Sequence, residues 1–222
     1  MKHIQKNEEP QEIATWKRKF KNAHGWRPKY DDIDQDLPHK MMLKESLIEE
    51  QGCICCYCCK RIVRENSHIE HFRPKGNPRY AKLSLEYDNL LASCQGYNNA
   101  QENCGHRKGN EFDEKLMTSP LEKDCEDHFK YSSRGKIMAV DGNVRAQYTI
   151  ESLELDSPQL NAARETAMWE SGAMEVTSEE ECRELLERFR KKDENGRYAG
   201  FCDVVVYQLE KRLAHFDCVK DA

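Results

Sequence analysis

An acidic residue followed directly by a histidine is the pair in this sequence best suited to hydrolytic chemistry. Glu70 and His71 stand in the segment SHIEHFRPK, residues 67–75. On an extended strand, consecutive side chains point to opposite faces, so the carboxylate and the imidazole would face different ways. A neutral imidazole can accept a proton from water near pH 7, and a carboxylate can hold a divalent cation. Because hydrolysis of a phosphodiester uses both functions, the pair indicates metal-assisted phosphodiester hydrolysis.

Eleven cysteines form a second group with metal-binding potential. Five of them lie between residues 53 and 59, and their odd total and close spacing argue against a disulfide framework. A reduced chain with a thiolate-bound structural zinc is favoured instead, with Cys94 and Cys104 as the second pair of ligands. The alternative is that several of these residues are simply buried thiols. The first pair of ligands would come from residues 53–59, where three pairs have C-x-x-C spacing: Cys53/Cys56, Cys55/Cys58 and Cys56/Cys59.

Helical patterns flank the cysteine-rich region on both sides. Apolar spacing predicts a short amphipathic helix over residues 13–20 and a second helix from Leu37 to Gln51, which Gly52 would cap. Helices are also predicted after Pro158, after Ser178 with its capping-box partner Glu181, and over residues 201–213. The apolar stripe of this last helix is interpreted as packed core.

Extended segments are predicted near the Glu70–His71 pair, at residues 61–72 and at YDNLLASC, residues 87–94. A strand followed by a turn is also predicted over residues 148–158. The chain is accordingly divided into an N-terminal helical segment (1–52), a central core (53–112) and a mostly helical C-terminal region (113–222) that is a candidate for partner docking.

Charge is distributed unevenly along the chain. The formal net charge is −5, yet residues 53–110 carry nine Lys and Arg against five Asp and Glu. This balance excludes a uniformly basic nucleic-acid binder but would draw a polyanion to the central segment. Mean hydropathy is −0.93, and there is neither an apolar run long enough to cross a membrane nor an apolar leader at the N-terminus. A cytoplasmic protein without membrane contact is therefore expected.

The order of three short motifs resembles the HNH (His-Asn-His) nucleases. The motifs are E-H-x-x-P from Glu70, N-L-x-x-x-C from Asn89 and C-G-H-x-K-G from Cys104. The opening MKHIQK and the segments at 125–131 and 146–150 are similar to the PtuB-like nuclease subunits of Septu and retron-associated anti-phage systems. The resemblance implies an α+β fold, in which a zinc-stabilised ββα-metal core is embedded in a mainly α-helical chain. Four cysteines match the zinc ligands of the family: Cys55, Cys58, Cys94 and Cys104.

The resemblance also implies roles for individual residues. His71 would be the general base, Glu70 a ligand of the catalytic cation, and Asn89 would orient the base-bearing loop or contact the metal. His106 would add a further metal ligand from the helix that follows. In many HNH proteins a His or Asn directly follows the cysteine, whereas here Gly105 fills that position.

The remaining histidines receive other interpretations. His68 lies three residues before His71, so on a strand it would face away from the base, and it is predicted to support the site from outside the ligand shell. The other five are interpreted as ordinary hydrogen-bonding residues: His3, His24, His39, His128 and His215.

Substrate and partners also follow from the resemblance. Mg²⁺ or Mn²⁺ would serve catalysis, and four basic residues would hold the phosphates: Arg73, Lys75, Arg107 and Lys108. The sequence has no P-loop motif, so any ATP dependence would come from a PtuA-type ATPase partner; some such systems add a reverse transcriptase with its multicopy single-stranded DNA. DNA is favoured over RNA such as tRNA. Two alternatives remain: a zinc-stabilised module that binds nucleic acid or a partner without catalysis, and a helical interaction protein.

Overall fold

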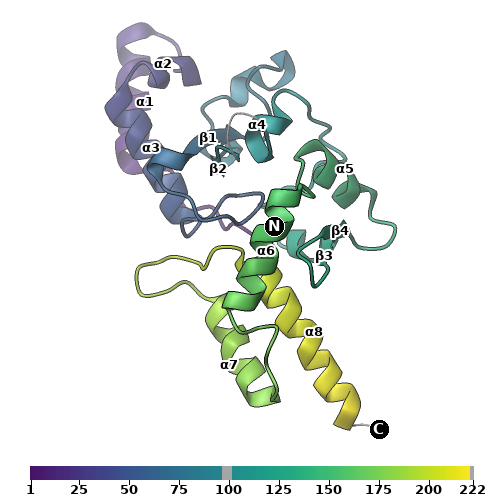
Figure 1. Ribbon diagram of the computed structural model, residues 1–222. Coiled ribbons are helices and arrows are strands. Elements are labelled where there is room, and N and C mark those ends of the chain that lie inside the picture. Colours follow the sequence, from purple (N-terminus) through teal and green to yellow (C-terminus); the bar gives the residue numbers. More distant parts are fainter. Residues whose placement is uncertain (97–101, 221–222) are drawn as a thin grey trace.

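Three helices form one end of the molecule in the computed structural model, which describes residues 1–96 and 102–220 (Figure 1). They are α1 (Gln11–His24), α2 (Tyr30–Asp34) and α3 (Leu37–Glu50). Helix α1 ends at Gly25, whose φ of 83° is a left-handed conformation that favours glycine. Helix α3 begins after Asp36, whose carboxylate accepts a hydrogen bond from the His39 backbone N–H. The two helices predicted from sequence in this part of the chain are therefore confirmed.

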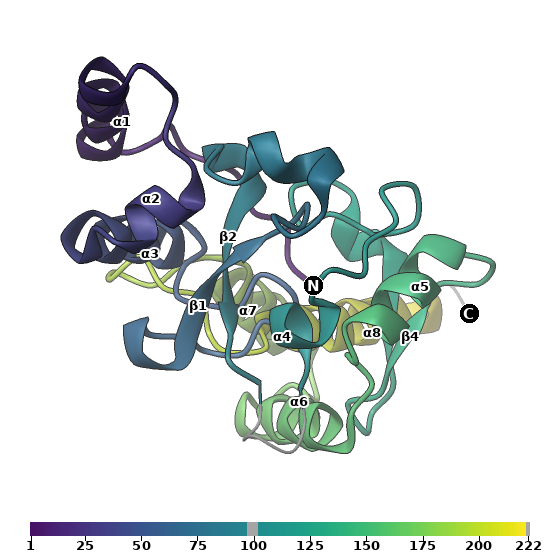
Figure 2. The same cartoon turned by 90° about the horizontal axis from the view of Figure 1, so that it is seen from above.

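An antiparallel hairpin and a short helix form the centre of the molecule. Strand β1 (Ser67–His71) pairs with β2 (Leu90–Cys94), with His71 opposite Leu90 and Ser67 opposite Cys94. Helix α4 (Cys104–Lys108) packs against β2, and α3 packs against both strands. Figure 2 shows α4 beside the hairpin. The loop between the strands contains two 3-10 helices, η2 (Pro78–Leu83) and η3 (Tyr87–Asn89).

The rest of the chain begins with a second small hairpin and continues through helices. Strands β3 (Phe129–Tyr131) and β4 (Ile137–Ala139) pair antiparallel. Four helices follow: α5 (Val144–Ser152), α6 (Pro158–Glu170), α7 (Glu179–Arg190) and α8 (Cys202–Lys220). Helix α7 lies along α8 (Figure 1), and Phe189 and Val205 are buried in this part of the core. The three C-terminal helices match the prediction, and the mixture of helices with small sheets agrees with an α+β class.

The strand predicted over residues 148–158 is wrong, because this stretch begins inside helix α5. The Asn143 side chain accepts a hydrogen bond from the Ala146 N–H and so caps the helix. Ala146, Thr149 and Ile150 are buried at spacings of three and four residues, which is the period of a helix face. The β-branched composition of YTI suggested a strand, but capping and burial determine the local structure.

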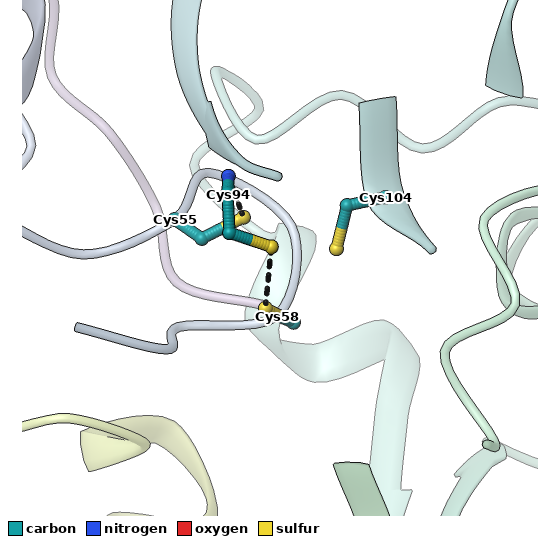
Figure 3. Close-up of side chains that lie close together, drawn as sticks. All are labelled: Cys55, Cys58, Cys94 and Cys104. Atoms are coloured by element: carbon teal, nitrogen blue, oxygen red, sulfur yellow. Dashed lines mark hydrogen bonds between the residues drawn. The ribbon is translucent and has the colours of Figure 1, made fainter. Parts of the chain in front are cut away.

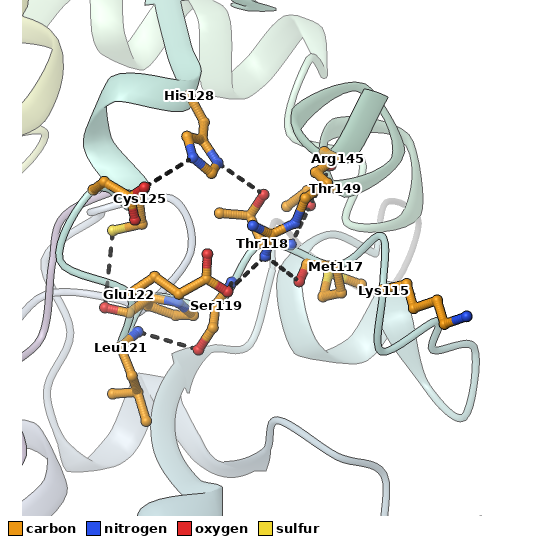
Figure 4. Close-up of polar contacts among 12 residues, drawn as sticks. Lys115, Met117, Thr118, Ser119, Leu121, Glu122, Cys125, His128, Arg145 and Thr149 are labelled. Carbon is orange, nitrogen blue, oxygen red and sulfur yellow. Dashed lines mark hydrogen bonds and ion pairs between the residues drawn. The ribbon is translucent and has the colours of Figure 1, made fainter. Parts of the chain in front are cut away.

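A polar network joins the segment before β3 to helix α5 (Figure 4). The Thr118 backbone N–H donates to Thr149 Oγ1 at 2.8 Å, and Arg145 pairs with Glu122 at 2.6 Å. The His128 ring lies 3.5 Å from Thr118 Oγ1 through its Nδ1. His128 is thus a hydrogen-bonding residue, as predicted.

One hydrophobic core runs through all three predicted segments. It includes Ile33 and Leu47 from the first, Leu91 from the second, and Leu160 and Val205 from the third. The division at residues 52 and 112 stays a prediction. Among the described residues, no helix combines the length and the apolar character needed to cross a membrane.

Candidate metal centre and hydrolytic site

Four cysteine side chains converge beside the central hairpin (Figure 3). Cys55 and Cys58 come from the loop after α3, Cys94 ends β2, and Cys104 begins α4. All four are buried, and their sulfur atoms lie within 4.8 Å of one another. The Cys58 and Cys94 sulfurs are 3.8 Å apart. A tetrahedral zinc with Zn–S bonds of about 2.3 Å has sulfur–sulfur edges of about 3.8 Å, so the group can hold a metal ion such as zinc.

The structure distinguishes among the three C-x-x-C pairs that the sequence leaves open. Cys55 and Cys58 belong to the four-sulfur group, whereas Cys53, Cys56 and Cys59 lie outside it. Burial raises the pKa of Cys56 and of Cys59, which keeps these two thiols protonated. They therefore act as small buried side chains of the core.

Two N–H donors point at sulfur atoms of the group. The Cys94 backbone N–H donates to Cys55 Sγ at 3.3 Å, and the Asn103 side-chain amide donates to Cys104 Sγ at 3.2 Å. Donors around thiolate ligands are the usual outer shell of a metal site. The donor set therefore fits a metal held by thiolates.

His71 ends strand β1 and is almost fully buried, with 8% of its surface exposed. Its Nε2 atom lies 2.9 Å from the Ser84 carbonyl oxygen, and the Tyr30 ring packs edge-on at 4.6 Å between ring centroids. Burial lowers the pKa of His71 to about 4, so the imidazole is neutral at pH 7. A proton on Nε2, donated to this carbonyl, would leave Nδ1 as the acceptor.

Asn89 fixes the loop that follows His71. Its side-chain oxygen accepts from the Arg73 N–H at 2.8 Å, and its amide donates to the carbonyls of Arg73 and Leu83. The Phe72 N–H donates to the Asn89 carbonyl at 2.9 Å. These bonds join the two ends of the long loop between β1 and β2, so Asn89 positions the residues beside the base rather than reaching out to a ligand.

Glu70 points to the other face of β1, as strand alternation predicts. Its Oε1 atom accepts from the Tyr57 hydroxyl at 3.1 Å and from Lys108 Nζ at 2.6 Å. Burial raises the pKa of Glu70, but the adjacent His68 and Lys108 lower it by more, so the carboxylate is ionised. Its second oxygen, Oε2, lies 3.5 Å from His68 Nε2.

His68 lies beside Glu70 in this part of the structure, and its predicted supporting role stays a prediction. It faces away from His71, and for that reason shares the face of Glu70, two residues along the strand. Its Nδ1 atom is buried and has no hydrogen-bond partner among the residues that the structure describes.

Gly105 makes the space that His68 uses. A Cβ atom at this position would collide with Glu70 Oε2 and would lie 2.6 Å from His68 Nε2. His106, one residue later on α4, has its ring 4.3 Å from the His68 ring between centroids. Burial and the neighbouring His68 lower the pKa of His106, which favours its neutral form. His68 thus lies between β1 and α4 with Glu70 on one side and the His106 ring on the other.

The basic residues predicted to hold phosphate are engaged within the protein. Arg73 pairs with Glu114 at 3.0 Å, and Lys75 pairs with Asp31 at 3.0 Å. Arg107 lies 4.0 Å from Glu154.

The prediction that Lys108 contacts phosphate does not fit its position. Its side chain is 1% exposed, and Nζ donates to the carbonyls of His71 and Phe72 besides Glu70. Lys108 supports the ends of the hairpin from inside the core.

Replacing Lys108 with methionine is expected to lower the free energy of unfolding by about 3–5 kcal/mol, because the Glu70 carboxylate would stay buried without its cation. Urea denaturation followed by circular dichroism measures the loss. Adding Glu70→Gln to Lys108→Met should recover part of it, and Arg107→Met is the matched surface control. A Lys108→Met chain as stable as the wild type would disprove the role assigned to this ion pair.

The comparisons with known proteins agree with the resemblance seen in the sequence. No protein-family model matches the chain. Similar curated proteins include two named as HNH endonucleases of retrons, a name given as provisional. The retron Vc95 protein of Vibrio cholerae serotype O1 biovar El Tor is 29% identical over 56% of this chain and 62% of its own length. The retron Ec83 protein of Escherichia coli is 29% identical over 74% of this chain and 78% of its own length.

A third similar protein comes from a different defence system by name. Septu protein PtuB of Bacillus mycoides strain KBAB4 is 28% identical over 49% of this chain and 45% of its own length. The chain therefore spans less than two thirds of the length of two of these three relatives. By sequence, the chain is similar to proteins named as HNH endonucleases of retrons and to Septu PtuB.

Proposed function

We propose that the chain is a metal-dependent HNH endonuclease that hydrolyses phosphodiester bonds of DNA as the effector of an anti-phage defence complex. The observation that carries the proposal is the arrangement at the end of β1, where the neutral imidazole of His71 and the ionised carboxylate of Glu70 lie on opposite faces of the strand. In this proposal β1, β2 and α4 form the ββα-metal core, and the four-cysteine group braces it with zinc.

His71 is the general base of the proposed reaction. Its Nδ1 atom, which has no hydrogen-bond partner within the described residues, would take a proton from the attacking water. The Ser84 carbonyl would hold the Nε2 proton and stabilise the imidazolium that forms. Asn89 keeps the loop after His71 in place through its bonds to the Arg73 backbone, so the base would move little during the step.

Glu70 and His68 are the residues whose atoms fit a divalent cation. Glu70 Oε2 and His68 Nε2 lie 3.5 Å apart, and the absence of a side chain at Gly105 leaves room for both atoms beside α4. The donor set of one carboxylate and imidazole nitrogens suits Mn²⁺ and accepts Mg²⁺, with His106 as a further ligand from α4. A bound cation would offset charge on the scissile phosphate and on the leaving 3′ oxygen. The four-thiolate zinc has no open position and would remain structural.

Gly105→Ala tests this cation site. The added methyl group must displace Glu70 Oε2 or His68, so we expect the affinity for Mn²⁺ to fall by about 10–100-fold, the size typical of disturbed metal ligands. Isothermal titration of Mn²⁺ into the zinc-loaded chain measures it without any substrate. Gly200→Ala is the matched control, because its Cβ would meet nothing closer than 3.6 Å. Unchanged Mn²⁺ affinity in Gly105→Ala would rule out a cation at this position.

The proposed substrate and partners rest on the resemblance and on the names of the relatives. Retron and Septu names connect the similar proteins to defence systems. We therefore propose an ATPase subunit of the PtuA type as partner and, where a retron is present, a reverse transcriptase with its multicopy single-stranded DNA. DNA is the proposed target, and RNA such as tRNA is the alternative that the experiment must separate.

The direct test is metal-dependent cleavage by the chain purified with its genomic neighbours. Supercoiled plasmid and tRNA are incubated with the complex and Mn²⁺, with and without EDTA. We expect nicking of the plasmid that EDTA abolishes and added Mn²⁺ restores. Cleavage of tRNA alone would move the proposal to RNA. Tight binding of both nucleic acids without cleavage would favour the non-catalytic binding module.

A further inference from the structure

Positive charge that is available to an anion lies away from the four residues predicted to hold phosphate. Arg73, Lys75 and Arg107 each face an acidic side chain, and Lys108 is buried. An incoming phosphate would therefore compete with a carboxylate for each of the three exposed cations.

In contrast, a groove between α1 and η2 is lined by several exposed cations. It encloses about 670 Å³ and is lined by the turn after α1, by the end of η2 and by Ser84. Five exposed cations line it: Arg18, Lys21, Arg27, Lys29 and Lys82. None of the five forms an ion pair within residues 1–96 and 102–220. Two acidic residues share the lining, and one of them, Glu9, is paired with Lys17.

This basic groove lies next to the proposed base. Ser84 lines the groove, and its carbonyl oxygen is the hydrogen-bond partner of His71 at 2.9 Å. Lys29, from the opposite wall, directly precedes Tyr30, whose ring packs against the His71 imidazole. Both sides of the groove thus reach the residues that hold His71.

We propose that the basic groove binds the sugar–phosphate backbone of the nucleic-acid substrate and leads it to His71, an inference that rests on the proposed nuclease function. Unpaired Lys and Arg side chains along one channel are the usual means of holding a polyanion without reading its bases. Trp26, with 57% of its surface exposed, stands beside Arg27 and offers an aromatic face to an unstacked base.

Charge removal in the groove tests the proposal through binding. The triple variant Arg18→Gln, Lys21→Gln, Arg27→Gln is compared with Lys115→Gln, Arg134→Gln, Lys211→Gln, which removes the same charge from exposed positions elsewhere. Fluorescence anisotropy with a labelled DNA duplex in EDTA measures affinity over a range of salt. We expect the groove variant to bind about tenfold or more weakly at low salt, with the slope of log affinity against log salt reduced by about 3.

The control variant should bind like the wild type, within the small effect of net charge. Equal affinities and equal salt slopes for the groove and control variants would overturn the groove proposal. Cleavage by the wild type, assayed separately with Mn²⁺, distinguishes the two proposals. Groove-dependent binding together with no cleavage by the chain purified with its genomic neighbours would leave the groove in place and refute the nuclease. If the groove variant binds and cleaves the nucleic acid like the wild type, the groove proposal is refuted and the nuclease proposal is not.

Discussion

Changing His71 to alanine is expected to lower the rate of nucleic-acid cleavage by about 10²–10⁴-fold, the usual contribution of a general base. The neutral imidazole is a proton acceptor at the end of β1, and the Glu70 carboxylate beside it lies on the other face of the strand. Single-turnover cleavage of a plasmid with saturating Mn²⁺ measures the effect. Affinity for the nucleic acid should change little, because His71 is almost fully buried.

Folding must be separated from chemistry in this experiment, since His71 packs against Tyr30. His71→Gln keeps most of the volume and can still donate to the Ser84 carbonyl, so it should retain the wild-type melting temperature more closely than His71→Ala. His215→Ala, at an exposed position on α8, is the control for losing a histidine. Cleavage by a folded His71→Gln chain within a few-fold of the wild type would end the assignment of the base.

Removing one sulfur from the four-cysteine group is expected to have the largest effect on stability. Structural zinc contributes apparent binding energies of about 10–16 kcal/mol in small zinc domains, more than the total stability of most folds. Cys94→Ala should therefore lose its metal and the native arrangement of β1, β2 and α4. Zinc content measured by mass spectrometry and the near-ultraviolet circular dichroism spectrum report the two losses independently.

Cys56→Ala is the matched control, because Cys56 is equally buried, lies between the ligands Cys55 and Cys58 and stays outside the group. It should keep one zinc per chain and a spectrum close to that of the wild type. Wild-type protein purified without bound zinc, or a Cys94→Ala chain that retains it, would contradict the assignment of the four ligands.

Much of the helical framework could be predicted from sequence, because its signals are local. Capping residues and three-to-four-residue apolar spacing marked α3, α6, α7 and α8 correctly. The error at α5 arose because Tyr148, Thr149 and Ile150 have strand-like composition, whereas the Asn143 cap lies five residues before Tyr148. Composition and capping disagreed there, and the burial that decides between them is a tertiary property.

The candidate site was harder to predict, because its geometry depends on contacts between distant segments. Cysteine spacing left three pairs open before the hairpin, and the family resemblance selected Cys55 and Cys58. Strand alternation predicted the opposite orientation of Glu70 and His71. It could not show that Lys108 turns inward, since an exposed and a buried lysine have the same sequence pattern. Nor could it show that the missing side chain of Gly105 on α4 makes room for His68 on β1, because this fit exists only after the two elements pack.

The placement of the four sulfurs also bears on how the chain folds. Cys55 precedes the hairpin and Cys104 follows it, so a bound ion closes a long loop that contains both strands. Closing such a loop costs conformational entropy before any strand contact compensates for it. We therefore expect refolding from urea to accelerate when zinc is supplied at the start, and cells starved of zinc to accumulate the protein as insoluble aggregate.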